Sequence, residues 1–244
     1  MRFYSIRLRT LLFALSLTIV LLLGIMFLPF IAQLTESADI FYAGLLVPSV
    51  IIDAGHGGID GGASGPGGLT EAPLNLDIAL RLRDLFSFIG VQTVLTREDE
   101  GSLNYDAEKT IKENKNADLQ ARLELSRRLP DCPFLSIHLN KYVQPQYKGA
   151  QVFYSPNHND AIMLSNCLQD AMRAGLDSQN TRKAKLAPEG IYLMKHISAP
   201  AVTIECGFLS NPEETALLAL PGYRLKIAAS ICCGYTEYLQ KRGC

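Results

Sequence analysis

The sequence predicts an α/β fold: a single domain with a mostly parallel sheet of about six strands and helices on both faces, preceded by an N-terminal transmembrane helix. Two patterns predict the domain. Short runs rich in valine and isoleucine alternate with longer segments whose apolar residues recur every three or four positions. Repeated strand–helix units of this kind favour parallel strands covered by their connecting helices. No internal repeat or second domain interrupts the pattern, so we expect one domain over residues 47–244.

The expected elements follow in chain order. A strand at 47–53 leads into a glycine-rich loop at 53–68, and a helix at 75–88 ends before Gly90, a residue suited to the position after a helix. The polar stretch 97–116 is expected to be a loop with some helix. Further strands are expected at 91–95, 134–139, 149–154, 191–194 and 201–205, and further helices at 119–129, 160–176 and 221–240.

The first 34 residues have a different character. No charged residue occurs between Arg9 and Glu36, and residues 11–28 are almost wholly apolar. A stretch of about 18 or more such residues can span a bilayer, whereas the apolar core of a cleaved signal peptide usually has about 7–15. We therefore expect an uncleaved anchor at 1–34 and a linker at 35–46, with cleavage as the alternative. The arginines before the apolar stretch favour a cytoplasmic N-terminus, which would place the domain outside the cytoplasm.

The charge balance gives no sign of a nucleic-acid partner. The chain has a net charge of -1, and residues 1–34 contain three arginines and no acid, which leaves 20 basic and 24 acidic residues for the rest. An acidic excess does not provide the positive surface that binds phosphate backbones. The six cysteines include no C-x-x-C pair, so a cysteine-ligated zinc site is not expected, and most are expected to be small buried residues.

Four polar residues occur where the predicted fold would bring them together. His56, His138 and Glu205 come at or just after the ends of apolar runs, and Glu71 lies between the first strand and the helix that follows it. In an open α/β sheet, ligands bind outside the carboxyl ends of the strands. Two histidines and a carboxylate fit a catalytic zinc site with an open position. A further carboxylate fits the proton transfer of metal-assisted hydrolysis.

Each of these residues also has a simpler interpretation. The glycines around His56 are typical of a phosphate-binding or flexible loop, although neither G-x-G-x-x-G nor G-K-[ST] is present. Glu71 could only offset the charge of a helix start, and His138 could be a structural histidine. Glu205 is harder to explain in this way, because a carboxylate on an apolar strand is costly to bury without a partner. The other two histidines, His158 and His196, are expected on the surface, with an approach to the site as the alternative for His196.

Around these residues the chain resembles the zinc-dependent N-acetylmuramoyl-L-alanine amidases, the type-3 amidase family of bacterial cell-wall hydrolases. The resemblance runs from about Ser49 to Gln240. Each motif alone would be weak, but their order and number are specific. The motifs are IIDAGHGG around His56, Glu71, VLTR ending at Arg97, the helix with Arg122, SIHLN around His138, and TIECGFLSNPEE from Thr203 to Glu214.

The resemblance implies that His56, Glu71 and His138 bind one Zn²⁺ per chain and that Glu205 is the catalytic glutamate. The implied reaction is hydrolysis of the amide between N-acetylmuramic acid and L-alanine in peptidoglycan. Further candidates, for supporting a ligand or contacting the substrate, are Asp53, Asn140 and Arg97.

Some features depart from the general family pattern. The segment 98–117 is longer than the expected link, and neither wall-binding repeats nor an autoinhibitory helical insertion is found. With the expected anchor, the chain resembles the germination-type amidases of the spore cortex, which remove stem peptides so that muramic-δ-lactam can form. The partners then implied are peptidoglycan, the membrane and an accessory protein, and the implied location is the cell wall or the forespore envelope space.

Two alternatives belong to other functional classes. One is a catalytically silent wall-binding or scaffold protein on the same fold, which would have no need of Glu205. The other is a nucleotide-binding protein that uses the glycine-rich loop, and the expected location outside the cytoplasm argues against it.

Overall fold

The computed structural model describes residues 50–243 and seven isolated helical positions before them, at 13, 15, 17, 18, 25, 27 and 28. The expected transmembrane segment at 1–34 and linker at 35–46 therefore lie almost wholly outside the described residues. Within the described part, no single helix has the length and apolar character to cross a membrane. The helices Pro212–Leu218 and Pro221–Arg242, which meet at a bend of 90°, are long and apolar enough only when they are counted together.

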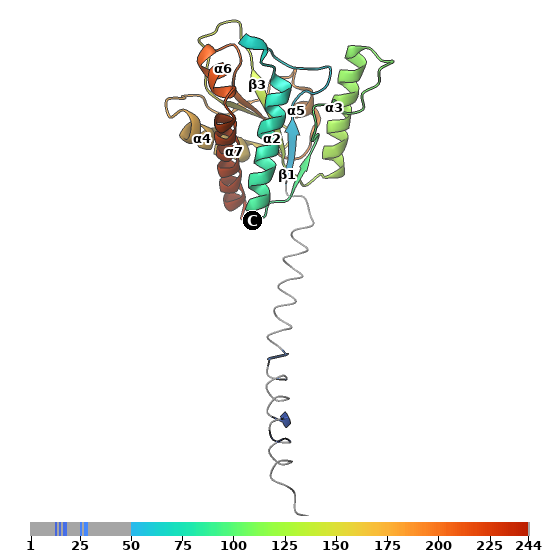
Figure 1. The fold of residues 1–244 in the computed structure, drawn as a ribbon, viewed down its shortest axis with the longest axis vertical. Helices are drawn as coiled ribbons and strands as arrows, with labels where there is room; N and C mark the ends of the chain where they lie inside the picture. The colour runs from blue at the N-terminus through green and yellow to red at the C-terminus, as the bar shows by residue number, and fades with distance from the viewer. Residues whose placement is uncertain are drawn as a thin grey trace, which may run out of the picture. The chain divides into compact units, whose positions relative to one another are not determined.

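Residues 48–244 form one compact unit built on a six-stranded sheet (Figure 1). The strands are β1 (Val50–Ala54), β2 (Thr93–Leu95), β3 (Phe134–Asn140), β4 (Gln151–Tyr154), β5 (Lys185–Leu186) and β6 (Ala201–Phe208). The helices are α2 (Glu71–Phe88), α3 (Ile111–Arg128), α4 (Asp160–Leu176), α5 (Tyr192–His196), α6 (Pro212–Leu218) and α7 (Pro221–Arg242).

The strand order is β2-β1-β3-β6-β4-β5. The first four of these strands run parallel, which confirms the mostly parallel sheet. β4 pairs antiparallel with β6, and β5, which the sequence pattern does not predict, pairs parallel with β4. The parallel strands thus share one carboxyl edge, where ligands of such sheets collect.

Helices cover both faces of the sheet, as expected. On one face, α2, α4 and α7 pack over a large apolar core, and Figure 1 shows α2 and α7 next to each other. On the other face, α3 and α5 pack against a smaller core that includes Ile51, Phe134 and Ala201. Successive side chains of a strand point to opposite faces. In each of these strands, the residues two or four positions after Ile51, Phe134 or Ala201 therefore lie on the face that α3 covers.

Two helices begin earlier than the apolar pattern predicts. α2 begins at Glu71 rather than at 75, so Glu71 is the first helical residue and not part of the loop before it. α3 begins at Ile111 rather than at 119, because Thr110 and Glu113 form a capping box: Thr110 Oγ1 accepts from the Glu113 backbone N–H at 3.3 Å, and the Glu113 carboxylate accepts from the Thr110 N–H at 2.9 Å. The T-x-x-E spacing is the signal that could have located this start.

The expected strand at 191–194 is wrong, because this segment belongs to the short helix α5. Leu193 and Met194 are buried in the smaller core, and the Tyr192 and His196 rings stack with centroids 4.3 Å apart. A short apolar run does not distinguish a strand from a helical turn by periodicity. Three of the five described cysteines, Cys132, Cys167 and Cys206, are buried, as expected for small core residues.

Candidate active site

His138 and Glu205 lie side by side at the carboxyl edge of the sheet. In the register of β3 and β6, His138 is opposite Glu205. Each stands four residues after a residue of the smaller core, Phe134 and Ala201 respectively, so both side chains lie on the α3 face. Beyond this pair the strand register shifts. The sheet itself therefore places an imidazole and a carboxylate about one strand spacing apart, ~4.8 Å.

His56 reaches the same edge from the loop after β1. Its backbone has a φ of 62°, in the left-handed region that residues other than glycine seldom adopt. The buried Arg122 side chain on α3 holds this conformation by donating to the carbonyl oxygens of His56, at 2.7 Å, and Ala54, at 2.8 Å. Backbone strain of this kind persists only where surrounding contacts enforce it.

Glu71 is buried at the start of α2 and fixed through both carboxylate oxygens. Oε2 accepts from the Ala63 backbone N–H at 2.8 Å, and Oε1 accepts from the Leu139 N–H at 3.0 Å. Oε1 also lies 2.9 Å from His138 Nδ1 and 3.3 Å from His56 Nε2. One ligand atom from each of these three residues lies within 4.8 Å of the others, so the group could hold a metal ion.

Two glycines allow this close arrangement. A Cβ added at Gly55 would lie 2.4 Å from the His138 ring. At Gly62, where φ is +68°, an added Cβ would lie 2.6 Å from Glu71 Oε2 and 2.8 Å from His56 Cδ2. The glycine-rich loop is thus needed for packing against the three-residue group, in addition to turning the chain.

Asp60 is a site residue that the sequence reasoning missed. Its Oδ2 lies 3.0 Å from His56 Nδ1, and its Oδ1 lies 3.0 Å from Lys115 Nζ on α3. His56 therefore faces Glu71 with one ring nitrogen and Asp60 with the other. An acid four residues after a histidine in the same loop was the available signal, although spacing in a loop does not fix contact as it does in a helix.

His56, Asp60 and Glu71 shift one another's pKa. Burial would lower the pKa of His56, but the hydrogen bonds and charges of Glu71 and Asp60 outweigh it and raise that pKa to about 9. Burial would raise the pKa of Glu71, but hydrogen bonds with His138 and His56 hold that pKa well below its usual range. The group therefore favours a positive charge among these residues.

The pKa of Glu205 is shifted upward, in contrast to that of Glu71. Burial raises the pKa of Glu205 to about 7, and the nearby charge of Glu71 acts in the same direction, against the opposing effect of His138. Its Oε2 is buried and has no hydrogen-bond partner among the described residues. A buried carboxylate oxygen without a donor is costly, so this atom can accept a hydrogen bond from a bound water or substrate.

Asp53, Arg97 and Asn140, the other predicted site residues, form no hydrogen bond with the side chains of the three-residue group among the described residues. Asp53 was expected to support a ligand histidine, but its hydrogen bonds in the described structure go to Arg122, to Ser136 Oγ at 2.5 Å and to Thr96 Oγ1 at 2.8 Å. It supports His56 only indirectly, by fixing Arg122.

Arg97 is also buried, and within the described part of the chain its hydrogen bonds do not involve the side chains of His56, Glu71 or His138. Its guanidinium donates to four backbone carbonyls, those of Ala54, Gly55, Ala72 and Asp99. It therefore ties the glycine-rich loop to α2. Asn140 is half-buried at the end of β3, and no hydrogen bond of its side chain occurs among the described residues, so a role in substrate contact stays a prediction. His196 is exposed and His158 is half-buried near the surface.

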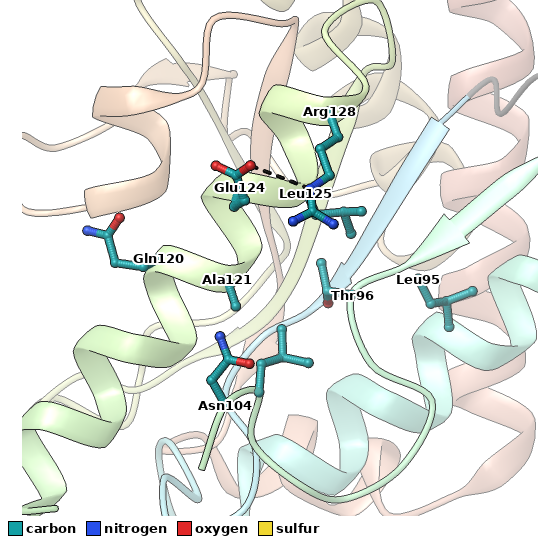
Figure 2. A pocket seen from close by; sticks show the side chains of 9 residues that line it. Leu95, Thr96, Asn104, Gln120, Ala121, Glu124, Leu125 and Arg128 are labelled. Carbon is teal, nitrogen blue, oxygen red and sulfur yellow. Dashed lines mark hydrogen bonds and ion pairs between the residues drawn. The ribbon is translucent and has the colours of Figure 1, made fainter. Parts of the chain in front are cut away.

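Two hollows lie near α3. A cavity of about 270 Å³ opens beside His56 and His138, with Lys115 and Leu119 of α3 and Leu193 of α5 in its wall. A second hollow of about 540 Å³ lies between the end of β2 and α3 (Figure 2). Its wall contains the Glu124–Arg128 ion pair, at 3.4 Å, but no histidine or cysteine. The chemistry of the site therefore belongs with the smaller cavity.

The fold and this edge of the sheet define an α/β enzyme class in which a histidine–glutamate–histidine group able to hold a metal ion stands beside a glutamate with an unpaired oxygen. Residues 50–237 match the family described as N-acetylmuramoyl-L-alanine amidase. The chain belongs to this family, and it is an amidase that acts on peptidoglycan.

Known relatives agree with this assignment. The chain is 38% identical over 194 residues to the germination-specific N-acetylmuramoyl-L-alanine amidase of Bacillus subtilis (strain 168), over 80% of this chain and 81% of that protein. Among solved structures, it is similar to the CwlD amidase from Clostridioides difficile in complex with the GerS lipoprotein, with a TM-score of 0.76, 41% identity, and coverage of 79% of this chain and 98% of that one. It is also similar to the amidase AmiC2 of Nostoc punctiforme, with a TM-score of 0.67, 30% identity, and coverage of 78% and 96%.

Proposed function

We propose that this protein uses zinc to hydrolyse the amide between N-acetylmuramic acid and L-alanine, with His56, Glu71 and His138 as the zinc ligands and Glu205 as the group that moves the proton. The observation that carries the proposal is that Oε2 of Glu205 is buried and has no hydrogen-bond partner among the described residues. Glu205 lies opposite His138 in the sheet. A scaffold protein would gain nothing from such a costly atom.

The three proposed ligands suit zinc. Two imidazole nitrogens and one carboxylate oxygen are common zinc donors, and three protein ligands leave a position open for substrate or water. The carboxylates of Glu71 and Asp60 beside His56 support the same proposal, because their negative charges attract a cation. Bound zinc supplies a Lewis acid that polarises a carbonyl oxygen and acidifies water.

Glu205 would perform both proton transfers. A carboxyl group with a pKa near 7 is well matched to accept a proton from water and to deliver it to the departing amine of L-alanine. Asp60 would accept a hydrogen bond from the Nδ1–H of His56, which leaves Nε2 as the nitrogen that would bind zinc.

The biological setting is part of the proposal. The similarity to a germination-specific amidase supports a role in spore cortex maturation, with muramic-δ-lactam formation after the stem peptides are removed. A similar amidase was solved in complex with a lipoprotein, which supports an accessory protein as a partner here. We further propose that residues 1–34 anchor the protein in the membrane, that 35–46 form a linker, and that the domain at 47–244 acts outside the cytoplasm, in the cell wall or forespore envelope space.

The test of the chemistry combines zinc content with product analysis on the full-length protein in detergent. Purified peptidoglycan is the substrate, and released stem peptides with free L-alanine N-termini are measured by mass spectrometry. We expect about one zinc per chain, and we expect Glu205→Gln to keep the zinc while turnover falls by about 10²–10⁴-fold. Glu108→Gln, a change at an exposed glutamate in the loop before α3, is the matched control. Wild-type turnover by zinc-loaded Glu205→Gln would refute the proposed role.

The setting needs separate measurements. Replacement of residues 1–34 by a cleavable signal peptide should move the protein from the membrane fraction to the medium or the soluble extracytoplasmic fraction. Loss of the gene in its source should remove muramic-δ-lactam from spore cortex. Unchanged lactam would reject the cortex role while leaving the amidase chemistry intact.

A further inference from the structure

The loop between β3 and β4 carries an exposed pair of tyrosines. Tyr142 is 53% exposed and Tyr147 is 41% exposed, and between them Val143 is 92% exposed. The two tyrosine rings pack edge to face, with centroids 4.9 Å apart and an interplanar angle of 73°. Such a pair presents a rigid, partly apolar surface with hydroxyl groups at its margin.

The loop is held in place by the segment that follows β6. The Tyr142 backbone N–H donates to Ser210 Oγ at 3.0 Å, and Asn211 Nδ2 donates to the Pro145 carbonyl at 2.8 Å. Lys148 Nζ lies 3.4 Å from the Glu213 carboxylate. The surface is therefore pre-organised, and a ligand that binds it does not need to order a flexible segment first.

This surface is close to the reacting groups. Tyr142 follows His138 by four residues, which limits the separation of their Cα atoms to about 15 Å. Ser210, which anchors Tyr142, follows Glu205 by five residues. The tyrosines thus stand just beyond the two strands that carry His138 and Glu205.

The two flanks of the site differ in chemistry. On the α3 flank, the cavity wall is charged, with Asp60, Lys115, Asp118 and Arg122. In the loop after β3, residues 142–147, YVQPQY, are exposed and uncharged, with an exposed lysine on either side of them. The scissile amide of an N-acetylmuramoyl-L-alanine amidase also has two unlike sides, a neutral sugar ring and a charged peptide. Sugar rings pack their C–H faces on aromatic side chains, and amide groups such as those of Gln144 and Gln146 suit their hydroxyls.

We propose that the Tyr142–Tyr147 pair is a glycan subsite that binds a pyranose ring of the peptidoglycan strand while the stem peptide lies on the α3 flank. The inference rests on the peptidoglycan amidase activity but not on zinc or on the role of Glu205. It assigns the two halves of the substrate to the two flanks of the site.

The first test measures binding without turnover. Full-length protein in detergent is co-sedimented with insoluble glycan strands from which the stem peptides have been removed. Tyr142→Ala and Tyr147→Ala should each weaken binding by about tenfold or more, whereas Tyr105→Ala should not, although Tyr105 is also 53% exposed. Because no amide is cleaved, the outcome does not depend on the proposed zinc chemistry. Unchanged binding by both alanine variants, or equal loss in Tyr105→Ala, would overturn the proposal.

A second test adds a probe rather than removing a side chain. The chain contains no tryptophan, so Tyr142→Trp introduces a single indole into the proposed subsite and keeps an aromatic surface there. Soluble stem-free glycan fragments should shift its emission to shorter wavelength, and the same fragments should leave Tyr105→Trp unchanged. An unshifted Tyr142→Trp emission at glycan concentrations that saturate co-sedimentation would also overturn the proposal. In kinetics, Tyr142→Ala should raise KM for polymeric peptidoglycan and leave kcat near the wild-type value.

Discussion

His138 on β3 lies directly opposite Glu205 on β6, and both side chains lie on the face of the sheet that α3 covers. Strand pairing thus sets the spacing between a histidine of the three-residue group and the glutamate with the unpaired oxygen. His56 and Glu71 reach the same place by a different route, through a glycine-rich loop and the first turn of α2. The contacts of this loop are therefore the part of the site that single substitutions can change without altering the sheet.

Gly55→Ala should displace the His138 ring. The added Cβ would lie 2.4 Å from atoms of the His138 ring, so the ring could not keep its place in the three-residue group. We expect zinc affinity and amidase activity to fall by about 10–100-fold, as when ligand support is lost. Gly61→Ala is the matched control in the same loop, because an added Cβ there meets nothing within 4 Å. Competition with a chromogenic chelator measures the affinity, and wild-type zinc binding in Gly55→Ala would contradict the structure.

Asp60→Asn should weaken the site without unfolding the domain. The change replaces the carboxylate that lies 3.0 Å from His56 Nδ1 with a neutral amide, so the hydrogen bond that fixes the histidine's tautomer and orientation loses its charge and becomes weaker. We expect zinc affinity to fall by about 10–100-fold and the thermal midpoint of the metal-free protein to stay near the wild-type value. Lys115→Gln, which removes only the exposed ion-pair partner of Asp60, should have a smaller effect. Equal effects of the two changes would mean that charge near α3, and not the contact with His56, sets the affinity.

Asp53→Asn should destabilise the fold in a pH-dependent way. Burial would raise the pKa of Asp53, but the charge of Arg122 and the hydrogen bonds from Ser136 and Thr96 outweigh it and hold that pKa below its usual range. Because the folded pKa is lower than the unfolded value of about 3.9, the carboxylate stabilises the protein above that pH, and this contribution is lost as the pH falls through the folded pKa.

We therefore expect Asp53→Asn to lower the free energy of unfolding by about 3–5 kcal/mol at pH 7, the cost of breaking a buried pair, and by less at pH 3. Urea unfolding at the two pH values measures the difference. Asp84→Asn, which changes an exposed ion pair, should cost less than about 1 kcal/mol at either pH. A difference between Asp53→Asn and wild type that grows on acidification would contradict the sign of the pKa shift.

Thr110→Ala should loosen the start of α3. Thr110 accepts from the Glu113 backbone N–H and donates its own N–H to the Glu113 side chain, and loss of an N-cap side chain typically costs about 1 kcal/mol. Hydrogen exchange should rise first in residues 111–114. Thr181→Ala, at an exposed threonine in a loop, should have no such effect. Unchanged exchange at the start of α3 would show that the cap does not hold this helix.

Much of the site could be predicted because its residues follow local patterns. His138 and Glu205 end apolar strands that the Val- and Ile-rich runs identify, and parallel strands share a carboxyl edge. The motifs around them were sufficient to predict the family that the comparison supports. α4 occupies the predicted residues 160–176, because its apolar spacing agrees with its packing.

Other features depend on contacts between distant segments, and no local pattern contains them. Asp53 and Arg122 are 69 residues apart, and only the packing of α3 on the sheet makes Asp53 a partner of Arg122 rather than of a histidine. The same packing brings Lys115 to Asp60, and the end of β6 brings Ser210 to Tyr142. The sequence by itself determined five of the six strands, most of the helices, the family and the choice of His56, Glu71, His138 and Glu205 as the expected site group, because each follows from periodicity or a short motif. Only the tertiary structure decided which buried charges pair, that residues 192–196 are helical, and that Asp60 contacts His56, because those outcomes are set by burial and tertiary contact rather than by sequence pattern.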